Sequence, residues 1–256
     1  MEESETKTGE EEFRKSFTDF TEASYVDALE LAKRNYIFAR FTHPPAGKHV
    51  LWRHDIDFSA HRALKLAMLE YQAGVVATYF LYPHSPFYNL FSADIRDIVR
   101  RIASLGHDLG LHFDPTFSGA VKREQILKNI AIEKRWIHEL TGVVPVALSY
   151  HLFGVLAVPP PDDARVCKMV NAYGKGIWGS YGYCSDSNGI WRFRRLYDVL
   201  SEATEDKLQV LTHPEVWTPE PMSPRARIQR CIDGYAVAAG KYYDDLVSAS
   251  GRPNVR

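Results

Sequence analysis

Several features that would assign a chain to a special class are missing or scarce in these 256 residues. There are three cysteines, Cys167, Cys184 and Cys231, with no CxxC pair, which predicts reduced thiols in a cytoplasmic protein rather than a disulfide framework. Neither charge dominates, since 31 Lys+Arg face 32 Asp+Glu, and this disfavours nucleic acid and anionic membranes as partners. No apolar run approaches the ~20 residues of a membrane span. The acidic start MEESETKTGEEEF lacks the apolar centre of a secretory signal.

What remains is the composition of a folded protein. Hydrophobic residues make up 45% and charged residues 25%, close to the average of globular domains. A chain of this length buries a sizeable core without disulfides. Residues 1–12 contain six acids and almost nothing to bury, so we expect a disordered acidic tail there. Without a convincing linker further on, we expect residues 13–256 to form a single domain.

Apolar strands alternate with helical segments along the rest of the chain. We predict strands over 50–53, 75–82, 107–113, 143–150, 177–183 and 208–212, and helices over 25–38, 60–72, 92–105, 122–140, 162–172 and 224–248. Such alternation is typical of an α/β fold, with mostly parallel strands and helices outside. Functional sites in these folds lie at the carboxyl ends of the strands.

Ionisable residues gather at four of these strand ends. Asp55 and Asp57 follow the first strand, and the period of two places them on one face, where a metal or a shared proton would relieve their repulsion. The alternative is that one caps the next helix and the other is solvated. By the same spacing His112 and Asp114 share a side of the third strand.

Two more histidines, His151 and His213, end the fourth and the last strand. Each alone could be an ordinary core or surface histidine. Together with the aspartates they form a carboxylate–imidazole set that suits Zn²⁺ or another borderline divalent ion. An open position on such an ion holds a water whose pKa falls toward ~7, so the pattern favours metal-assisted hydrolysis.

Four motifs carry a family resemblance: HDID at 54–57, ATYFL at 77–81, GHDLGLHFD at 106–114 and LTHP at 211–214. Their order and spacing resemble the polysaccharide deacetylase superfamily of carbohydrate esterases, in a divergent branch, over roughly residues 17–217. The resemblance implies a distorted (β/α) barrel of about seven mostly parallel strands with helices outside. It also implies a divalent metal, with zinc as the preferred ion and Co²⁺, Ni²⁺ or Mn²⁺ as alternatives.

Carried over residue by residue, the resemblance assigns most of the chemistry. Asp55 would be the catalytic base, Asp57 and His112 metal ligands, and His213 the acid that protonates the leaving amine. The two family acids are usually adjacent, whereas Ile56 separates them here, which leaves open which aspartate does which job.

Two further positions depart from the family pattern. The position of the second metal histidine holds Thr116, so the third ligand is His151 or Asp114, with His151 preferred on ligand type. The arginine that orients the base in the family has no counterpart at Tyr150-His151-Leu152. We expect Asp114, Asp186 and His54 to contact the substrate, and Asp186 alternatively to orient His213.

The sequence thus predicts a metal-dependent deacetylase or amidohydrolase acting on C–N bonds other than peptide bonds. It would use a metal-bound water to remove an acyl group from an N-acylated amino sugar or a similar small amide. The preferred acyl group is acetyl. A cytoplasmic location favours a small-molecule substrate over a cell-wall polymer. Two alternatives stay open: a non-catalytic metal- or ligand-binding barrel, and a hydrolase of non-carbohydrate amides.

Overall fold

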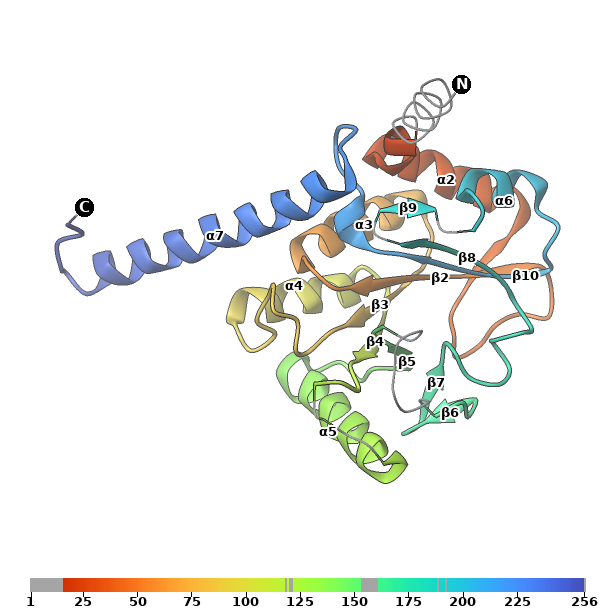
Figure 1. The fold of residues 1–256 in the computed structure, drawn as a ribbon, viewed down its shortest axis with the longest axis horizontal. Coiled ribbons are helices and arrows are strands. Elements are labelled where there is room, and N and C mark those ends of the chain that lie inside the picture. Colours follow the sequence, from red (N-terminus) through yellow and green to blue (C-terminus); the bar gives the residue numbers. More distant parts are fainter. Residues whose placement is uncertain are drawn as a thin grey trace, which may run out of the picture.

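The computed structural model describes residues 16–117, 119, 122–152, 161–187, 189–191 and 193–255. The acidic tail expected over 1–12 lies outside these residues. A short 3₁₀ helix, η1 (Ser16–Phe20), and helix α2 (Glu22–Asn35) come before the sheet. Figure 1 shows the central sheet with helices packed along it and one long helix, α7, projecting from the body.

The elements that follow alternate for most of the chain, as the sequence predicted. The strands are β1 (Ile37–Ala39), β2 (His49–Ile56), β3 (Thr78–Leu81), β4 (Asp108–Phe113), β5 (Ala147–Tyr150), β6 (Arg165–Val166), β7 (Met169–Asn171), β8 (Gly182–Ser187), β9 (Ile190–Trp191) and β10 (Lys207–Thr212). The helices are α3 (Ala60–Ala73), α4 (Ala93–Ser104), α5 (Arg123–Thr141), α6 (Leu196–Glu202), the 3₁₀ helix η3 (Pro214–Val216) and α7 (Pro224–Ala249).

All ten strands belong to one sheet, in the order β6-β7-β5-β4-β3-β2-β10-β8-β9, with β1 beside β2. Every pairing from β7 to β8 is parallel, and only the two edge pairs, β6–β7 and β8–β9, are antiparallel. This confirms the α/β class and the mostly parallel sheet with helices outside. Among the described residues β6 and β9 are not paired with each other, so the barrel-like sheet is not closed.

The sheet separates two layers of core. Trp52, Ile56 and Tyr79 pack on the helix-covered side against buried residues of α2 and α3, whereas Leu51 and Phe80 pack in a smaller cluster on the other side. All eight residues of β2 are buried, as expected for a central strand of a parallel sheet covered on both faces. The alternation along β2 therefore decides which side chains face which layer.

Helix ends follow the local signals in the sequence. Ser59 accepts a hydrogen bond from the backbone N–H of Arg62 and caps α3, and Gly74 ends it with φ of 71°. Ser92 stands at the N-cap of α4 without a side-chain capping bond, since its hydroxyl donates to Asn89 instead.

Two predicted elements were wrong or displaced. The helix expected over 162–172 is absent, because a tight turn with Cys167 and Lys168 at φ of 47° and 68° pairs β6 with β7. The strand expected over 177–183 lies instead at Gly182–Ser187, because hydrogen-bonded turns occupy the preceding residues. In the part of the chain that the structure describes, no helix is both long and apolar enough to cross a membrane.

Candidate metal and acid–base site

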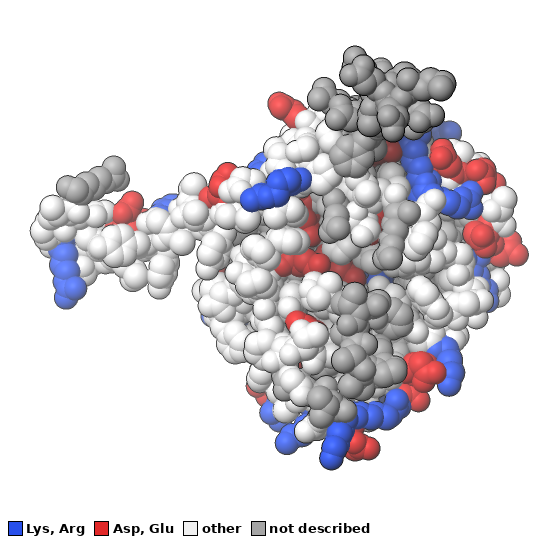
Figure 2. All heavy atoms as spheres, viewed as in Figure 1, with Lys and Arg blue, Asp and Glu red and all other residues white. Residues whose placement is uncertain are grey.

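The carboxyl ends of β2, β4, β5, β8 and β10 meet around a cavity of about 740 Å³. The ionisable side chains that line it are Asp55, Asp57, His112, His151, Asp186, His213, Glu215 and Arg225. Figure 2 shows acidic side chains in a hollow near the middle of the drawn face, with lysines and arginines mostly at its periphery. The parallel topology thus brings together Asp55 and Glu215, which are 160 positions apart, as the strand-end rule predicts.

Three of these side chains converge on one point. The Oδ1 atom of Asp57 lies 3.3 Å from Nε2 of His112 and 3.6 Å from Nδ1 of His151, and the two ring nitrogens are 3.1 Å apart. The three atoms all lie within 4.8 Å of one another. Asp57 Oδ1 is buried and makes no hydrogen bond within the described residues. One carboxylate and two imidazoles in this arrangement fit a divalent cation.

The other ring nitrogen of His112, Nδ1, is hydrogen-bonded to a buried serine. Its Nδ1 lies 2.6 Å from the Ser149 hydroxyl, which in turn donates to Asp55 Oδ1 at 3.2 Å. With Nδ1 protonated toward Ser149, the lone pair of Nε2 points at Asp57 and His151. Such outer hydrogen bonds fix the tautomer of a metal-binding histidine.

Asp55 lies beside this cluster and against a buried arginine. Arg53 is fully buried on the same face of β2, with Nη2 3.4 Å from Asp55 Oδ2 and donating to the Tyr173 hydroxyl at 2.6 Å. Burial acts to lower the pKa of Arg53, but the attraction of Asp55 outweighs it and raises the pKa. Arg53 therefore stays cationic beneath the carboxylate. Sequence reasoning missed it, although the period of two that pairs Asp55 with Asp57 extends to Arg53.

Asp186 binds His213 across the cavity. One carboxylate oxygen accepts from the ring Nδ1, and the other accepts from the backbone N–H at 3.0 Å and from the Thr212 hydroxyl at 2.9 Å. Nε2 of His213 lies 3.8 Å from Asp57 Oδ2. Burial favours the neutral ring, but Asp186 outweighs it, so the pKa of His213 is raised well above its usual value.

The pKa of Asp57 moves the other way. Burial acts to raise it, but the close approach of the His112 imidazole, with smaller contributions from His151 and His213, holds it well below the usual range. Asp57 is therefore an ionised carboxylate, the form in which it ligates a metal.

Glu215 is a lining residue that sequence reasoning also missed. It follows His213 by two residues in the LTHPEVW segment, which was the only available signal. Its side chain is buried, and Oε2 has no hydrogen-bond partner in the described part of the chain. Burial raises the pKa of Glu215 to about 8, since the attraction of His213 only partly offsets it. A largely neutral carboxyl group thus lies next to the His213–Asp186 pair.

Two residues expected to contact substrate lie elsewhere. His54 faces the opposite side of β2, fully buried, with Nε2 2.6 Å from Glu70 Oε1. The cause is the same alternation that turns Asp55 toward the cavity. Asp114 uses both oxygens in the protein, accepting from the Tyr82 hydroxyl and from the backbone and hydroxyl of Thr116, and does not line the cavity. We therefore assign neither residue to substrate.

Aromatic side chains form much of the remaining wall: Phe58, Tyr150, Tyr173, Trp178, Tyr183 and Phe193. Trp178 and Phe193 are 50% and 69% exposed. Among the described lining residues Arg225 carries the only permanent positive charge. The cavity therefore combines a charged floor with flat apolar surfaces.

Comparison with known proteins adds the following. No family model matches the chain, and no curated protein matches it significantly. Similar solved structures include a family 4 acetyl xylan esterase from Clostridium thermocellum in complex with a cobalt ion, at 17% identity and a TM-score of 0.40, covering 80% of this chain and 92% of that one. The peptidoglycan deacetylase PdaC from Bacillus subtilis is 14% identical, with a TM-score of 0.43 and coverage of 81% and 99%.

A family 4 carbohydrate esterase from Bacillus anthracis is 15% identical, with a TM-score of 0.39 and coverage of 82% and 85%. Because the identities and TM-scores are low, we base the function on this chain's own residues.

Proposed function

We propose that the protein is a metal-dependent hydrolase of the polysaccharide deacetylase type. It removes an acyl group, with acetyl as the preferred choice, from the nitrogen of an amino sugar or a similar small amide. The observation that carries this proposal is the convergence of Asp57, His112 and His151, with Asp55 on one side and the His213–Asp186 pair on the other.

Asp57, His112 and His151 would hold the ion, since their three atoms converge and Asp57 Oδ1 lacks any other described partner. A divalent ion there supplies polarisation of the acyl carbonyl and a lowered pKa for water. We propose zinc as the ion, with Co²⁺, Ni²⁺ or Mn²⁺ as alternatives, because the site combines a hard carboxylate ligand with borderline imidazole ligands. His151 takes the third position, because Asp114 is engaged by Tyr82 and Thr116.

Asp55 is the proposed general base. It lines the cavity but has one oxygen held by Ser149 and the other near Arg53, so its carboxylate is fixed in direction. It accepts the proton of the attacking water as that water adds to the carbonyl carbon. Arg53 lies next to Asp55 and orients its carboxylate, which is the role that the resemblance gave to an arginine from another strand.

His213 is the proposed general acid. Asp186 accepts the proton on Nδ1, so the protonated ring carries its second proton on Nε2, which faces the cavity. The raised pKa keeps the ring protonated at neutral pH. Transfer of that proton to the departing nitrogen gives the free amine and leaves the acyl group as a carboxylate.

The aromatic wall supports a small substrate with a flat apolar face, such as a sugar ring. A hydrolase of non-carbohydrate amides stays an alternative, because the same surfaces accept other rings. Among the described residues that line the cavity, arginines and lysines form no cluster that would bind a polyanion. We also propose a cytoplasmic location, in keeping with three cysteines that are all free.

The test is elemental analysis together with an acetate-release assay on N-acetylglucosamine and its short β-1,4-linked oligomers. We expect near-stoichiometric divalent metal in the wild type and its loss in His112→Ala. Acetate release should require metal. If the purified protein neither contains nor takes up Zn²⁺, Co²⁺, Ni²⁺ or Mn²⁺, the proposal fails. If it binds metal but releases acetate from none of these sugars, a panel of N-acyl amines decides between the two substrate classes.

A further inference from the structure

Helix α7 is attached to the rest of the chain only through its first turns. Arg227 is fully buried and donates from Nη1 to the Gly189 carbonyl at 2.7 Å. From Asp233 to Ser250 every residue is exposed except the half-buried Val247. Figure 1 shows this part extending away from the body. More than half of the helix therefore packs against nothing that the structure describes.

A helix in this position lacks what normally stabilises one. Most helical stability in proteins comes from packing of one face, and short isolated helices are marginal in water. Gly234 and Gly240 lie inside the exposed part, and each costs about 1 kcal/mol relative to alanine in a helix interior. The sequence nevertheless keeps large apolar side chains there, with Tyr235 53%, Tyr242 67% and Leu246 51% exposed. Within the described part of the chain, no surface buries these apolar side chains.

These apolar residues follow a regular pattern. Steps of four and three alternate through seven positions: Ile228, Ile232, Tyr235, Ala239, Tyr242, Leu246 and Ala249. This is the heptad spacing with which two helices pack side by side. The residues next to the seam are mostly small or uncharged, and Ala236 and Ala238 allow close approach near its centre.

We propose that the chain forms a dimer in which the α7 helices of two copies pack antiparallel. With the two helices centred on Val237, Ile232 lies level with Tyr242 of the other copy. Tyr235 then lies level with Ala239 of the other copy, so a large side chain fills the space left by a small one. The same sequence supplies both halves, as a two-fold interface requires.

Charge favours the antiparallel direction. The exposed charges of the first half of α7 are Arg225, Arg230 and Asp233, with a net positive sign, and those of the second half are Lys241, Asp244 and Asp245, with a net negative sign. Antiparallel packing sets these halves opposite each other, whereas parallel packing sets like beside like.

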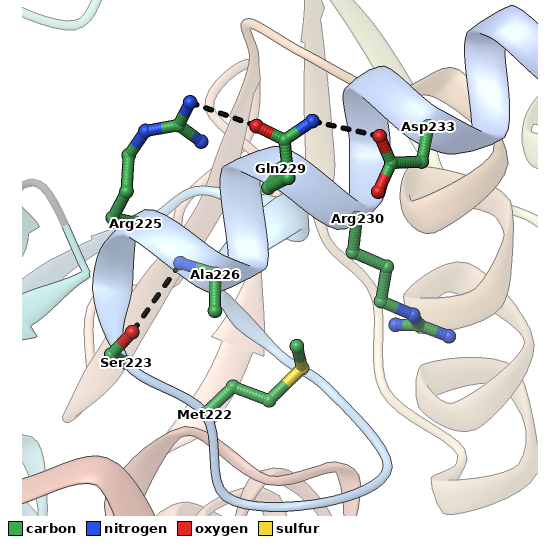
Figure 3. Close-up of a pocket in the computed structure, with 7 residues that line it drawn as sticks. All are labelled: Met222, Ser223, Arg225, Ala226, Gln229, Arg230 and Asp233. Atoms are coloured by element: carbon green, nitrogen blue, oxygen red, sulfur yellow. Dashed lines mark hydrogen bonds between the residues drawn. The ribbon is translucent and has the colours of Figure 1, made fainter.

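A hollow of about 660 Å³ lies beside the first turns of α7, on a different side of the helix from the seam. Figure 3 shows residues that line it, among them Met222, Arg225 and Arg230. With the helices antiparallel, the C-terminal end of the partner's α7 would lie level with Arg225, and the negative end of a helix dipole is favoured near arginine.

The area that the seam can bury approaches what a stable dimer needs. Tyr235 and Tyr242 are 53% and 67% exposed, so each can still bury a little over half of the ~150–250 Å² of an aromatic side chain. The two tyrosines of each helix thus supply roughly 400–500 Å² in the dimer. The isoleucines, leucines and alanines of both copies bring the total toward the ~1,200 Å² of stable interfaces.

Sedimentation equilibrium of the full chain tests the proposal. We expect the wild type at twice the chain mass of 29.2 kDa. The double variant Tyr242→Asp, Leu246→Asp should be monomeric, because it charges the seam. The matched control Val237→Asp changes a residue that is 73% exposed but lies on the outer side of the helix, and it should remain dimeric.

A monomeric wild type overturns the proposal, and so does a double variant that still dimerises. A monomeric Val237→Asp variant also overturns it, because that side chain lies outside the proposed seam. Near-UV circular dichroism of each variant confirms that the body is folded.

Spin labels give the direction. In a background without native cysteines, labels at Ser248→Cys should be far apart in an antiparallel dimer, by about 33 Å along the axis. Labels at Ala236→Cys, which flanks the seam near its centre, should lie nearly level and give a much shorter distance. A distance between the Ser248→Cys labels well below about 33 Å means parallel helices and contradicts the proposed arrangement.

Discussion

The carboxylate of Asp186 accepts from both the ring Nδ1 and the backbone N–H of His213. Two bonds from one residue fix the position of the ring as well as its tautomer. Because Asp186 is buried, its charge is weakly screened by solvent and acts strongly on the imidazole. The geometry is that of a histidine kept protonated at Nε2, facing a cavity whose opposite wall carries ionised Asp57.

Replacing Asp186 should therefore move the pH dependence of the proposed reaction. His213 must be protonated to act, so activity falls as pH rises through its pKa. Since Asp186 raises that pKa, Asp186→Asn should shift the alkaline limb to lower pH, by about one unit or more. The measurement is kcat/KM against pH for both proteins. An unmoved alkaline limb in a folded variant would separate His213 from the proton-transfer step.

Asp55 of β2 and Asp57, just beyond its end, should behave differently when each loses its charge. Asp57→Asn should abolish metal retention, since Asp57 supplies one of three converging atoms. Asp55→Asn should keep the metal and lower kcat by about 10²–10⁴-fold, the usual contribution of a general base. Elemental analysis and turnover of both variants, measured side by side, make the comparison. The opposite pattern would exchange the roles of the two residues.

Breaking the buried pair beneath the cavity should cost stability as well as activity. Arg53→Met leaves Asp55 without its cation, and loss of one partner of a buried ion pair typically destabilises by about 3–5 kcal/mol. Tyr173→Phe is the matched control, since it removes one hydrogen bond to Arg53 and keeps the pair, at a cost of about 1.5–3 kcal/mol. Urea denaturation of both variants measures the difference. Equal, small losses would mean that Arg53 contributes little charge compensation.

The sequence predicted which residues gather at this site better than it predicted the surrounding elements, for a physical reason. The period of two along a buried strand is local, so it places Asp55 and Asp57 on one face without further information. That rule also turns His54 away from the cavity. The position of His151 depends instead on the pairing of β4 with β5, which sets His112 opposite Ser149. Register between strands is a tertiary property that a single sequence does not state.

Errors elsewhere have the same origin. Residues 162–172 show only a weak alternation of apolar and polar side chains, so the sequence gives no clear strand signal there. The hairpin is held by Asn171, whose side-chain amide donates to the carbonyls of Pro161 and Asp163. Asp186 was expected to contact the substrate or to orient His213. It lies in β8, where pairing of Leu211 with Ser185 brings it beside His213. These contacts join segments distant in sequence, so they were not predictable from local pattern.

The opposite face of β2 provides a prediction that is independent of catalysis. Glu70 of α3 is fully buried and accepts from the hydroxyls of Tyr25 and Tyr79, with Nε2 of His54 at 2.6 Å. Burial acts to raise the pKa of Glu70, but the attraction of His54 and these hydrogen bonds lower it overall. This network anchors the strand that carries Asp55 and Asp57 to the helix behind it.

The sign of the pH effect follows from that lowered pKa. Glu70 stabilises the folded state above its unfolded pKa of about 4.3, and this contribution is lost as pH falls through the lower folded-state value. Glu70→Gln should therefore be less stable than the wild type at pH 7, by about 3 kcal/mol. The gap should narrow below pH 4, where the wild type loses the same contribution. Chemical denaturation at several pH values measures both free energies of unfolding. A gap that stays constant down to acid pH would show that the shape of Glu70, and not its charge, stabilises the sheet.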